Sequence, residues 1–336
     1  MSFFGARRHP GVTPLAVEGR LPGFGSATGW LNSEALTADD LHGKVVLADF
    51  WTYTCINWLR TLAWVRAWHE KYRDHGLVVV GVHTPEFWFE HDPENVSWAA
   101  KEMRVEYPVA LDPDYAVWND FGNRYWPAVY LADAEGRIRY HHFGEGDYDE
   151  CERAIQMLLR EAGVEGIGEA LVSPTPEGFE VQADWANLES PETYLGSEQG
   201  RGFASPSGAG SDEPRSYVLP ESLSLNQWAL AGDWTIEAGA AVSNASAGRL
   251  AFRFHARDVN LVLRVREEGA SVPFQVRIDG EAPGGAGGLD LDDTGRGTVT
   301  RPRLYQLIRL QGPIVDRTIE IEFGAGGVEA YVFTFG

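Results

Sequence analysis

The chain has 336 residues, of which 44% are hydrophobic, and its 12 Trp, 12 Tyr and 16 Phe are enough to fill two sizeable cores. The formal charge of -21 argues against nucleic acid or an anionic membrane surface as a partner, because repulsion would grow with each contact. The two cysteines, Cys55 and Cys151, imply no disulfide framework.

No apolar run approaches the roughly 18 residues of a membrane span, so we expect no transmembrane segment. Met1–Arg8 carries two arginines, but no apolar core of signal-peptide length follows. As it stands, the sequence predicts a cytoplasmic protein.

In chain order, Pro10–Gly43 reads as an irregular lead-in with a short strand near Trp30 and a helical turn capped by Thr37. Val45–Trp51 is apolar and β-branched, which predicts a buried strand. Cys55 then opens a helix. Because a helix N-terminus presents unpaired N–H groups and the positive end of the dipole, this position favours the thiolate.

The next elements alternate between strand and helix. This order predicts an α/β domain with right-handed crossovers. The expected strands and extended pieces are Leu77–His83, Tyr107–Leu111, Ala128–Leu131 and Arg137–Phe143; the expected helices are Asp92–Met103, Tyr115–Phe121 and Asp147–Ala162.

The composition shifts to Gly, Ser, Pro and Glu between Gly163 and about Pro220, which is typical of a linker or surface wrap. Beyond it, five segments alternate with period two between turn residues, which predicts an all-β jelly-roll sandwich. These segments are Ala251–Arg257, Val272–Ile278, Tyr305–Leu310, Thr318–Phe323 and Ala330–Phe335. The predicted domains are therefore residues 1–165, a linker at 166–219, and a sandwich at 220–336.

Lys44–Leu59 resembles the thioredoxin superfamily, most closely its TlpA/DipZ-type branch, with Asp49 six residues before Cys55. Trp126-Pro127 stands at the place of the family's cis-proline, and the resemblance covers roughly residues 10–165. It implies a thioredoxin-like α/β domain. Relatives also carry a β-sandwich resembling carbohydrate-binding modules, and they are often periplasmic, which gives an alternative location.

The sequence departs from that family where a dithiol thioredoxin has its second cysteine. Trp58 occupies this position, giving a C-x-x-W motif, and Ala63 replaces a proline that many relatives carry. A mixed disulfide at Cys55 would therefore wait for an external thiol. Cys151 is the only internal substitute, and a buried, inert thiol is the default reading of it.

The leading hypothesis is a thioredoxin-like redox protein that exchanges disulfides through Cys55, with Asp49 and Thr52 as further catalytic candidates. In dithiol relatives the matching aspartate assists proton transfer at the second cysteine. Here Asp49 serves Cys55 through water or is a structural remnant. The expected substrate-binding residues are Trp58, Trp126, Pro127 and Glu86.

Two alternatives remain open. Thr52 and Cys55 have the Thr-x-x-Cys spacing of peroxiredoxins, with Arg124 as the arginine, so a monothiol peroxidase is the runner-up. A redox-inactive scaffold that docks extended segments at Pro127 is the other. The expected partner is a protein or small-molecule thiol or disulfide, and the sequence leaves the oligomeric state open.

The sandwich raises two further questions. Its aromatic residues Trp228, Trp234, Tyr305 and Tyr331 would form platforms for a sugar if exposed, and core residues otherwise. The acidic turn Asp290–Gly295 imitates half of a calcium loop but lacks the closing glutamate. We therefore expect a glycan or protein ligand on this domain, but no metal and no cofactor.

Overall fold

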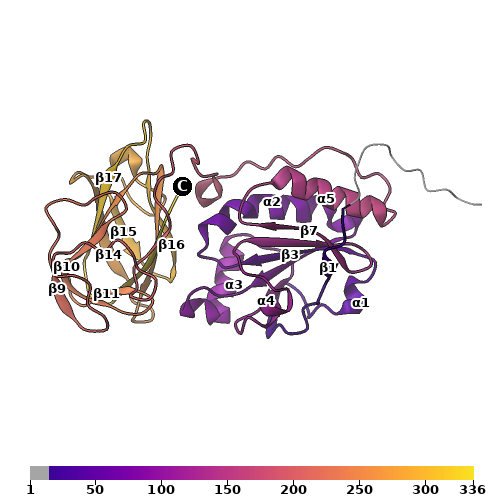
Figure 1. The fold of residues 1–336 in the computed structure, drawn as a ribbon, viewed down its shortest axis with the longest axis horizontal. Coiled ribbons are helices and arrows are strands. Elements are labelled where there is room, and N and C mark those ends of the chain that lie inside the picture. The colour runs from indigo at the N-terminus through magenta and orange to yellow at the C-terminus, as the bar shows by residue number, and fades with distance from the viewer. Residues whose placement is uncertain (1–14) are drawn as a thin grey trace, which may run out of the picture. The chain divides into compact units, whose positions relative to one another are not determined.

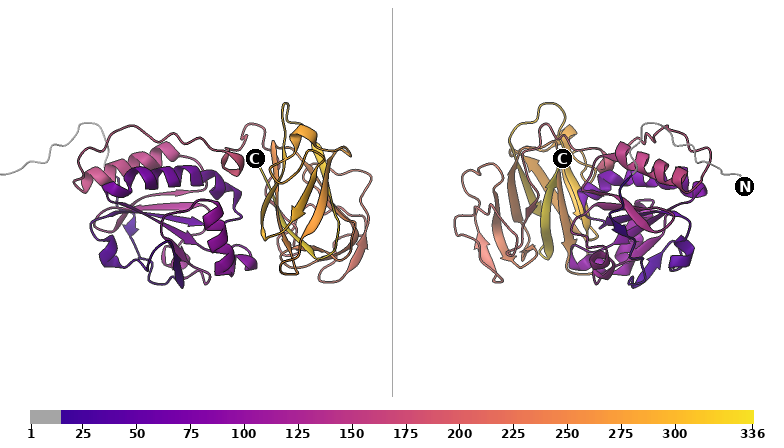
Figure 2. Two further views of the ribbon diagram at one scale, coloured as in Figure 1. Left: turned by 180° about the vertical axis from the view of Figure 1, so that it is seen from behind. Right: turned by 45° about the vertical axis from the view of Figure 1, so that its right-hand side comes forward.

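A computed structural model describes residues 15–336 of the chain, so the predictions for Met1–Arg8 and for the first residues of the lead-in from Pro10 lie outside the described part. The chain divides into two compact units. The first holds residues 15–52, 64–85 and 100–174. The second holds residues 53–63, 86–99 and 175–336. Figure 1 shows the ribbon, and Figure 2 shows it from two further sides.

The first unit is built on a seven-stranded sheet with the order β1-β7-β6-β3-β4-β5-β2. Strands β3, β4 and β5 run parallel, and their neighbours pair antiparallel. Its strands are β1 Gly19–Arg20, β2 Gly29–Leu31, β3 Val45–Trp51, β4 Leu77–His83, β5 Val109–Leu111, β6 Ala128–Ala132 and β7 Arg137–Phe143. Every residue of β3 is buried, as its unbroken apolar pattern predicts for a central strand.

Helices α2 and α5 lie along one face of this sheet, and α4 lies on the opposite face (Figure 1). The helices are α1 Ala38–Leu41, α2 Ile56–Tyr72, α3 Pro93–Glu102, α4 Ala116–Asp120 and α5 Tyr148–Glu161, with 3-10 turns η1 Arg73–His75 and η2 Trp88–His91. The buried Glu152 joins α5 to α2, because it accepts a 2.6 Å hydrogen bond from the hydroxyl of Tyr72. The α/β prediction is confirmed.

Local sequence explains where α2 begins and ends. Cys55 precedes the helix, and its carbonyl accepts the first helical hydrogen bond, from the N–H of Leu59 at 3.0 Å. At the other end, Gly76 follows η1 with φ of 92°, a left-handed conformation that glycine adopts without a side-chain clash. Cys55, the cysteine predicted to be reactive, is thus the N-cap residue of a 17-residue helix.

The second unit contains an eleven-stranded antiparallel sheet in which β10 pairs with β12 through its first residues and with β9 and β11 through its later ones. The order is β15-β14-β17-β12-β10-β11-β18-β13-β16, with β8 beside β18 and β9 beside β10. The strands are β8 Thr193–Tyr194, β9 Arg215–Tyr217, β10 Trp228–Ile236, β11 Ala241–Ser243, β12 Gly248–Phe254, β13 Asp258–Val265, β14 Val272–Ile278, β15 Arg296–Val299, β16 Arg303–Arg309, β17 Arg317–Phe323 and β18 Val328–Phe335. The all-β prediction for this part is confirmed.

The stretch expected as a linker contributes the two short strands β8 and β9 to this sheet. The domain limits at residues 165 and 220 stay a prediction. The four aromatic residues weighed as sugar platforms are buried: Trp228, Trp234, Tyr305 and Tyr331 are at most 3% exposed. They are core residues, because each packs its ring against other buried side chains.

No helix within residues 15–336 is long and apolar enough to cross a bilayer.

Candidate functional site

Cys55 lies between the end of β3 and the start of α2, and its side chain is a partly buried free thiol. It belongs to the second unit, together with the rest of segment 53–63. The first turns of the helix that follows Cys55 therefore belong to the same compact unit as the C-terminal strands.

The carboxylate of Glu90 links segment 53–63, which contains Cys55, to segment 86–99. The buried Glu90 accepts hydrogen bonds from the hydroxyl of Thr54 at 2.7 Å and from its N–H at 3.3 Å. Its other oxygen accepts from the N–H groups of Glu86 and Phe87 at 2.8 and 2.9 Å. Because these bonds reach a charged acceptor, they firmly hold Thr54, which precedes Cys55, and the backbone at Glu86 and Phe87.

Segment 86–99 in turn packs on β18 and β13. The indole N–H of Trp88 donates to the hydroxyl of Tyr331 at 2.9 Å, and Tyr331 donates to Glu329 at 2.7 Å. The Arg264 guanidinium lies 4.0 Å from the centre of the Trp88 ring, a cation–π contact. A further bond runs from Arg60 of α2 to the carbonyl of Phe335 at 3.0 Å. The C-terminal strands thus help to position the loop that carries Glu86.

The electrostatic surroundings raise the pKa of the Cys55 thiol well above its ordinary value, because burial disfavours the charged thiolate. The nearby carboxylate of Glu86 raises it further. Hydrogen bonds from the backbone N–H groups of Trp58 and Asn57 act in the opposite direction. The expectation of an acidified thiol is therefore wrong in sign: the helix N-terminus does favour the thiolate, but burial and Glu86 outweigh it.

Glu86 is the titratable group beside this thiol. Its carboxylate accepts a hydrogen bond from the hydroxyl of Tyr194 on β8. Burial, followed by the charge of Glu192, raises the pKa of Glu86 to about 8. A carboxyl group with this pKa can both accept and donate a proton near neutral pH.

A pocket of about 450 Å³ opens beside this group. Its lining includes Glu192, Tyr194, Glu198 and Arg201. Tyr194 lines the pocket and also donates a hydrogen bond to Glu86. A ligand in the pocket would therefore contact the residue that orients the carboxyl group beside Cys55.

Asp49 and Cys151 lie in the first unit. The fully buried Asp49 accepts a hydrogen bond from the hydroxyl of Tyr107 at 3.4 Å. Cys151 is 3% exposed, and burial, followed by the charge of Asp49, raises the pKa of its thiol. Such a thiol is a weak nucleophile at neutral pH, in agreement with the inert role expected for it.

The other four predicted site residues are divided between the two units. Thr52, Trp126 and Pro127 belong to the first unit, and Trp58 to the second. Thr52 and Trp58 are fully buried. The Trp126–Pro127 peptide bond is cis, and the Trp126 indole donates to the carbonyl of Thr84 at 3.1 Å. The catalytic and substrate-binding roles of these residues stay predictions.

Sequence reasoning missed Tyr194 and Glu192, because they stand in the stretch that was interpreted as a linker. One local signal was available. Thr193-Tyr194-Leu195 is a short β-prone, apolar triplet within a region rich in Gly, Ser, Pro and Glu, and it forms β8. Its pairing with β18 is remote in sequence and could not be deduced.

Two family models match the chain in separate parts. Residues 21–141 match the AhpC/TSA family, and residues 190–336 match the family described as thioredoxin like C-terminal domain. The chain therefore carries a thioredoxin-like redoxin domain followed by a thioredoxin-like C-terminal domain.

Curated relatives agree with these matches. The protein DipZ of Mycobacterium bovis is 39% identical over 258 residues, which cover 75% of this chain and 36% of DipZ. The chain thus spans about a third of the length of that relative. The thiol-disulfide oxidoreductase YkuV of Bacillus subtilis is 29% identical over 42% of this chain and 95% of its own. The solution structure of a thioredoxin-like protein in its oxidized form is 30% identical, covering 43% of this chain and 97% of its own, with a TM-score of 0.39.

Proposed function

We propose that the protein is a thiol-disulfide oxidoreductase that works through the single thiol of Cys55. The observation that carries the proposal is the group formed by Cys55, Glu86 and Tyr194, in which a carboxyl with a pKa of about 8 neighbours a helix N-cap thiol. The similarity to YkuV, named as a thiol-disulfide oxidoreductase, supports the reaction class.

The exchange runs in three steps. The Cys55 thiolate attacks one sulfur of a partner disulfide; a new S–S bond to Cys55 forms, and the old bond breaks to release a partner thiolate. A first external thiol attacks the Cys55 sulfur of this mixed disulfide and releases the second partner thiol, which leaves Cys55 bonded to the external sulfur. A second external thiol then attacks that external sulfur, forms the external disulfide and releases Cys55. Over a cycle, two external thiols are oxidised to a disulfide, and the partner disulfide is reduced to two thiols. Trp58 makes the second step intermolecular, because no thiol stands three residues after Cys55.

Glu86 moves the proton in this scheme. Its carboxylate takes the proton of the Cys55 thiol, and the protonated form then delivers it to the departing partner thiolate. Tyr194 orients the carboxyl group through its hydrogen bond. The raised pKa of the thiol makes this help necessary, because little thiolate forms unaided at neutral pH.

The C-terminal domain supplies the surroundings of the thiol and the ligand pocket. Its strand β8 provides Tyr194, and the 450 Å³ pocket beside it is the proposed site for the partner. Glu192 and Glu198 in the lining favour a partner that carries a positive charge near its sulfur. A jelly-roll sandwich, as in carbohydrate-binding modules, is the proposed architecture of this domain.

Steady-state kinetics test the proposal. Reduction of a protein disulfide with a small thiol as the electron donor should follow a double-displacement pattern, since the mixed disulfide separates the two half-reactions. Cys55→Ser should abolish turnover. Cys151→Ser is the matched control and should retain it.

The alternatives give different results in the same assay series. A peroxidase would consume hydrogen peroxide faster than the disulfide and would lose this activity in Thr52→Val. A docking scaffold would capture its partner equally well in Cys55→Ser. Either result would replace the exchange mechanism.

A further inference from the structure

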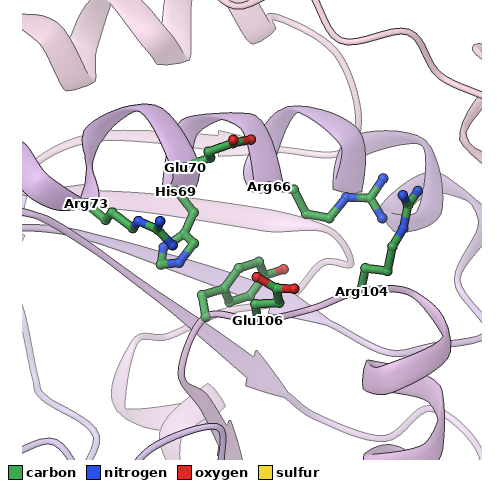
Figure 3. A pocket seen from close by; sticks show the side chains of 7 residues that line it. Arg66, His69, Glu70, Arg73, Arg104 and Glu106 are labelled. Carbon is green, nitrogen blue, oxygen red and sulfur yellow. The ribbon is translucent and has the colours of Figure 1, made fainter.

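The first unit contains a second pocket, of about 320 Å³, that takes no part in the proposed exchange. Arg66, His69 and Arg73 line it from α2 and η1, and Arg104 lines it from the loop before β5 (Figure 3). A spacing of three to four residues places the first three on one helix face. We name this hollow the arginine pocket.

The arginine pocket carries a net positive charge, although the chain as a whole is strongly acidic. Acidic residues outnumber basic ones by 49 to 28, so a surface arginine should readily find a carboxylate. Within residues 15–336, however, neither Arg73 nor Arg104 has a carboxylate oxygen within 4.0 Å. Arg66 donates to the carbonyl of Met103 at 2.7 Å, which orients its guanidinium. Arg73 and Arg104 thus carry charges that no ion pair offsets, and a bound anion would be attracted to both.

His69 adds a donor to the same lining. Its Nδ1 atom is buried and has no hydrogen-bond partner among the described residues. Burial, followed by the charge of Arg73, lowers the pKa of His69, so the ring is neutral at pH 7. The ring packs against the ring of the buried Tyr107, which also lines the pocket, with 5.8 Å between ring centroids. A buried ring nitrogen without a partner in a polar hollow is suited to bind a ligand oxygen.

Two carboxylates, Glu70 and Glu106, also line the pocket. With a neutral His69, the lining carries three positive and two negative charges, a net charge of one positive. Glu106 should therefore oppose an anion, and removing its charge should tighten binding. An anion site thus predicts that a Glu106 variant binds the anion more tightly, whereas a purely structural cluster predicts no such gain.

We propose that the arginine pocket binds the phosphate group of a small phosphorylated molecule. Guanidinium groups match the paired oxygens of a phosphate, and a phosphate monoester carries nearly two negative charges, which Arg73 and Arg104 can neutralise. The volume lies in the range of small-molecule sites. The inference does not depend on the redox proposal, because no residue of the pocket takes part in the exchange.

Titration with inorganic phosphate, followed by NMR of the histidine ring signals at constant ionic strength, tests the inference. The His69 signal, assigned with His69→Gln, should shift saturably, and its pKa should rise because a bound anion favours the imidazolium. Arg104→Gln should weaken binding roughly tenfold, the loss expected for one charge-assisted hydrogen bond. Glu106→Gln should strengthen it several-fold.

Arg20→Gln is the matched control, since Arg20 is exposed in the same unit and lies outside the pocket. Arg104 is also exposed, so its replacement should leave the thermal unfolding midpoint unchanged. A linear, unsaturated shift would overturn the site, as would equal affinities of wild type and Arg104→Gln. Tighter binding of citrate than of phosphate would overturn the phosphate assignment.

Discussion

Replacement of Glu86 by glutamine should make Cys55 react faster with iodoacetamide in alkaline solution, because this alkylation needs the thiolate but no proton delivery to a leaving thiol. The carboxylate of Glu86 is the second cause, after burial, of the raised pKa of the thiol. Glutamine keeps the size and can still accept a hydrogen bond from Tyr194, but it never carries the charge. The variant therefore removes the electrostatic effect and leaves the packing in place.

The size of the effect follows from Coulomb's law and from the titration of Glu86. A unit charge about 6 Å from a thiolate changes its energy by roughly 0.7 kcal/mol in water-like surroundings and by roughly 3 kcal/mol at an effective dielectric constant of about 20. Since Cys55 is only partly buried, we expect a value near 1 kcal/mol, which is about fivefold in thiolate population. Because the pKa of Glu86 is about 8, the charge is present at pH 9 and largely absent at pH 7.

The assay is the rate of iodoacetamide alkylation of Cys55 between pH 6 and 10, measured in a Cys151→Ser background. The ratio of the Glu86→Gln rate to the wild-type rate should be near one at pH 6 and should rise through pH 8 to about fivefold. Glu189→Gln removes an exposed charge elsewhere in the second unit and should leave the rate unchanged at every pH. A ratio that does not vary with pH would refute the reasoning, as would slower alkylation of the Glu86 variant at pH 9.

Three further results are expected. The wild-type protein should lose stability as the pH rises from about 5 toward 8, because folding raises the pKa of Glu86 from 4.5 to about 8; urea unfolding should show a flatter profile for Glu86→Gln. Tyr331→Phe should lower the free energy of unfolding by about 1–3 kcal/mol, since it removes a buried hydroxyl with two hydrogen-bond partners, whereas Tyr125→Phe at a 52% exposed position should change it little. A cationic methanethiosulfonate should modify Cys55 about tenfold faster than an anionic one at low salt, and Glu192→Gln should reduce this ratio; equal rates for both reagents would argue against a partner with positive charge.

The sequence predicted the first sheet well where burial alone decides the structure. Strands β3 and β4 have the expected limits to the residue, because both are unbroken apolar, β-branched runs between turn residues. The start of α2 follows from Cys55, and the end of the 3-10 turn η1 that follows it is set by Gly76; both are local features. Elements whose limits are set by residues close in the sequence could therefore be predicted from it.

The site was less predictable, because it depends on distant pairing and on the balance of opposing effects. Tyr194 reaches Glu86 only because β8 pairs with β18, and no local pattern specifies that register. The backbone N–H groups at the helix N-terminus do lower the pKa of Cys55, but they are not the dominant effect. Burial and the Glu86 charge act more strongly in the other direction, and neither can be read from the adjoining residues.

The most direct test of the account is the location of a trapped mixed disulfide. Reduced protein is mixed with glutathione disulfide, quenched with acid, digested and mapped by mass spectrometry. We predict glutathione on the peptide that contains Cys55 in the wild-type protein and in Cys151→Ser, with release on addition of a second thiol. An unmodified Cys55, or the same adduct yield in Cys55→Ser, would contradict the account.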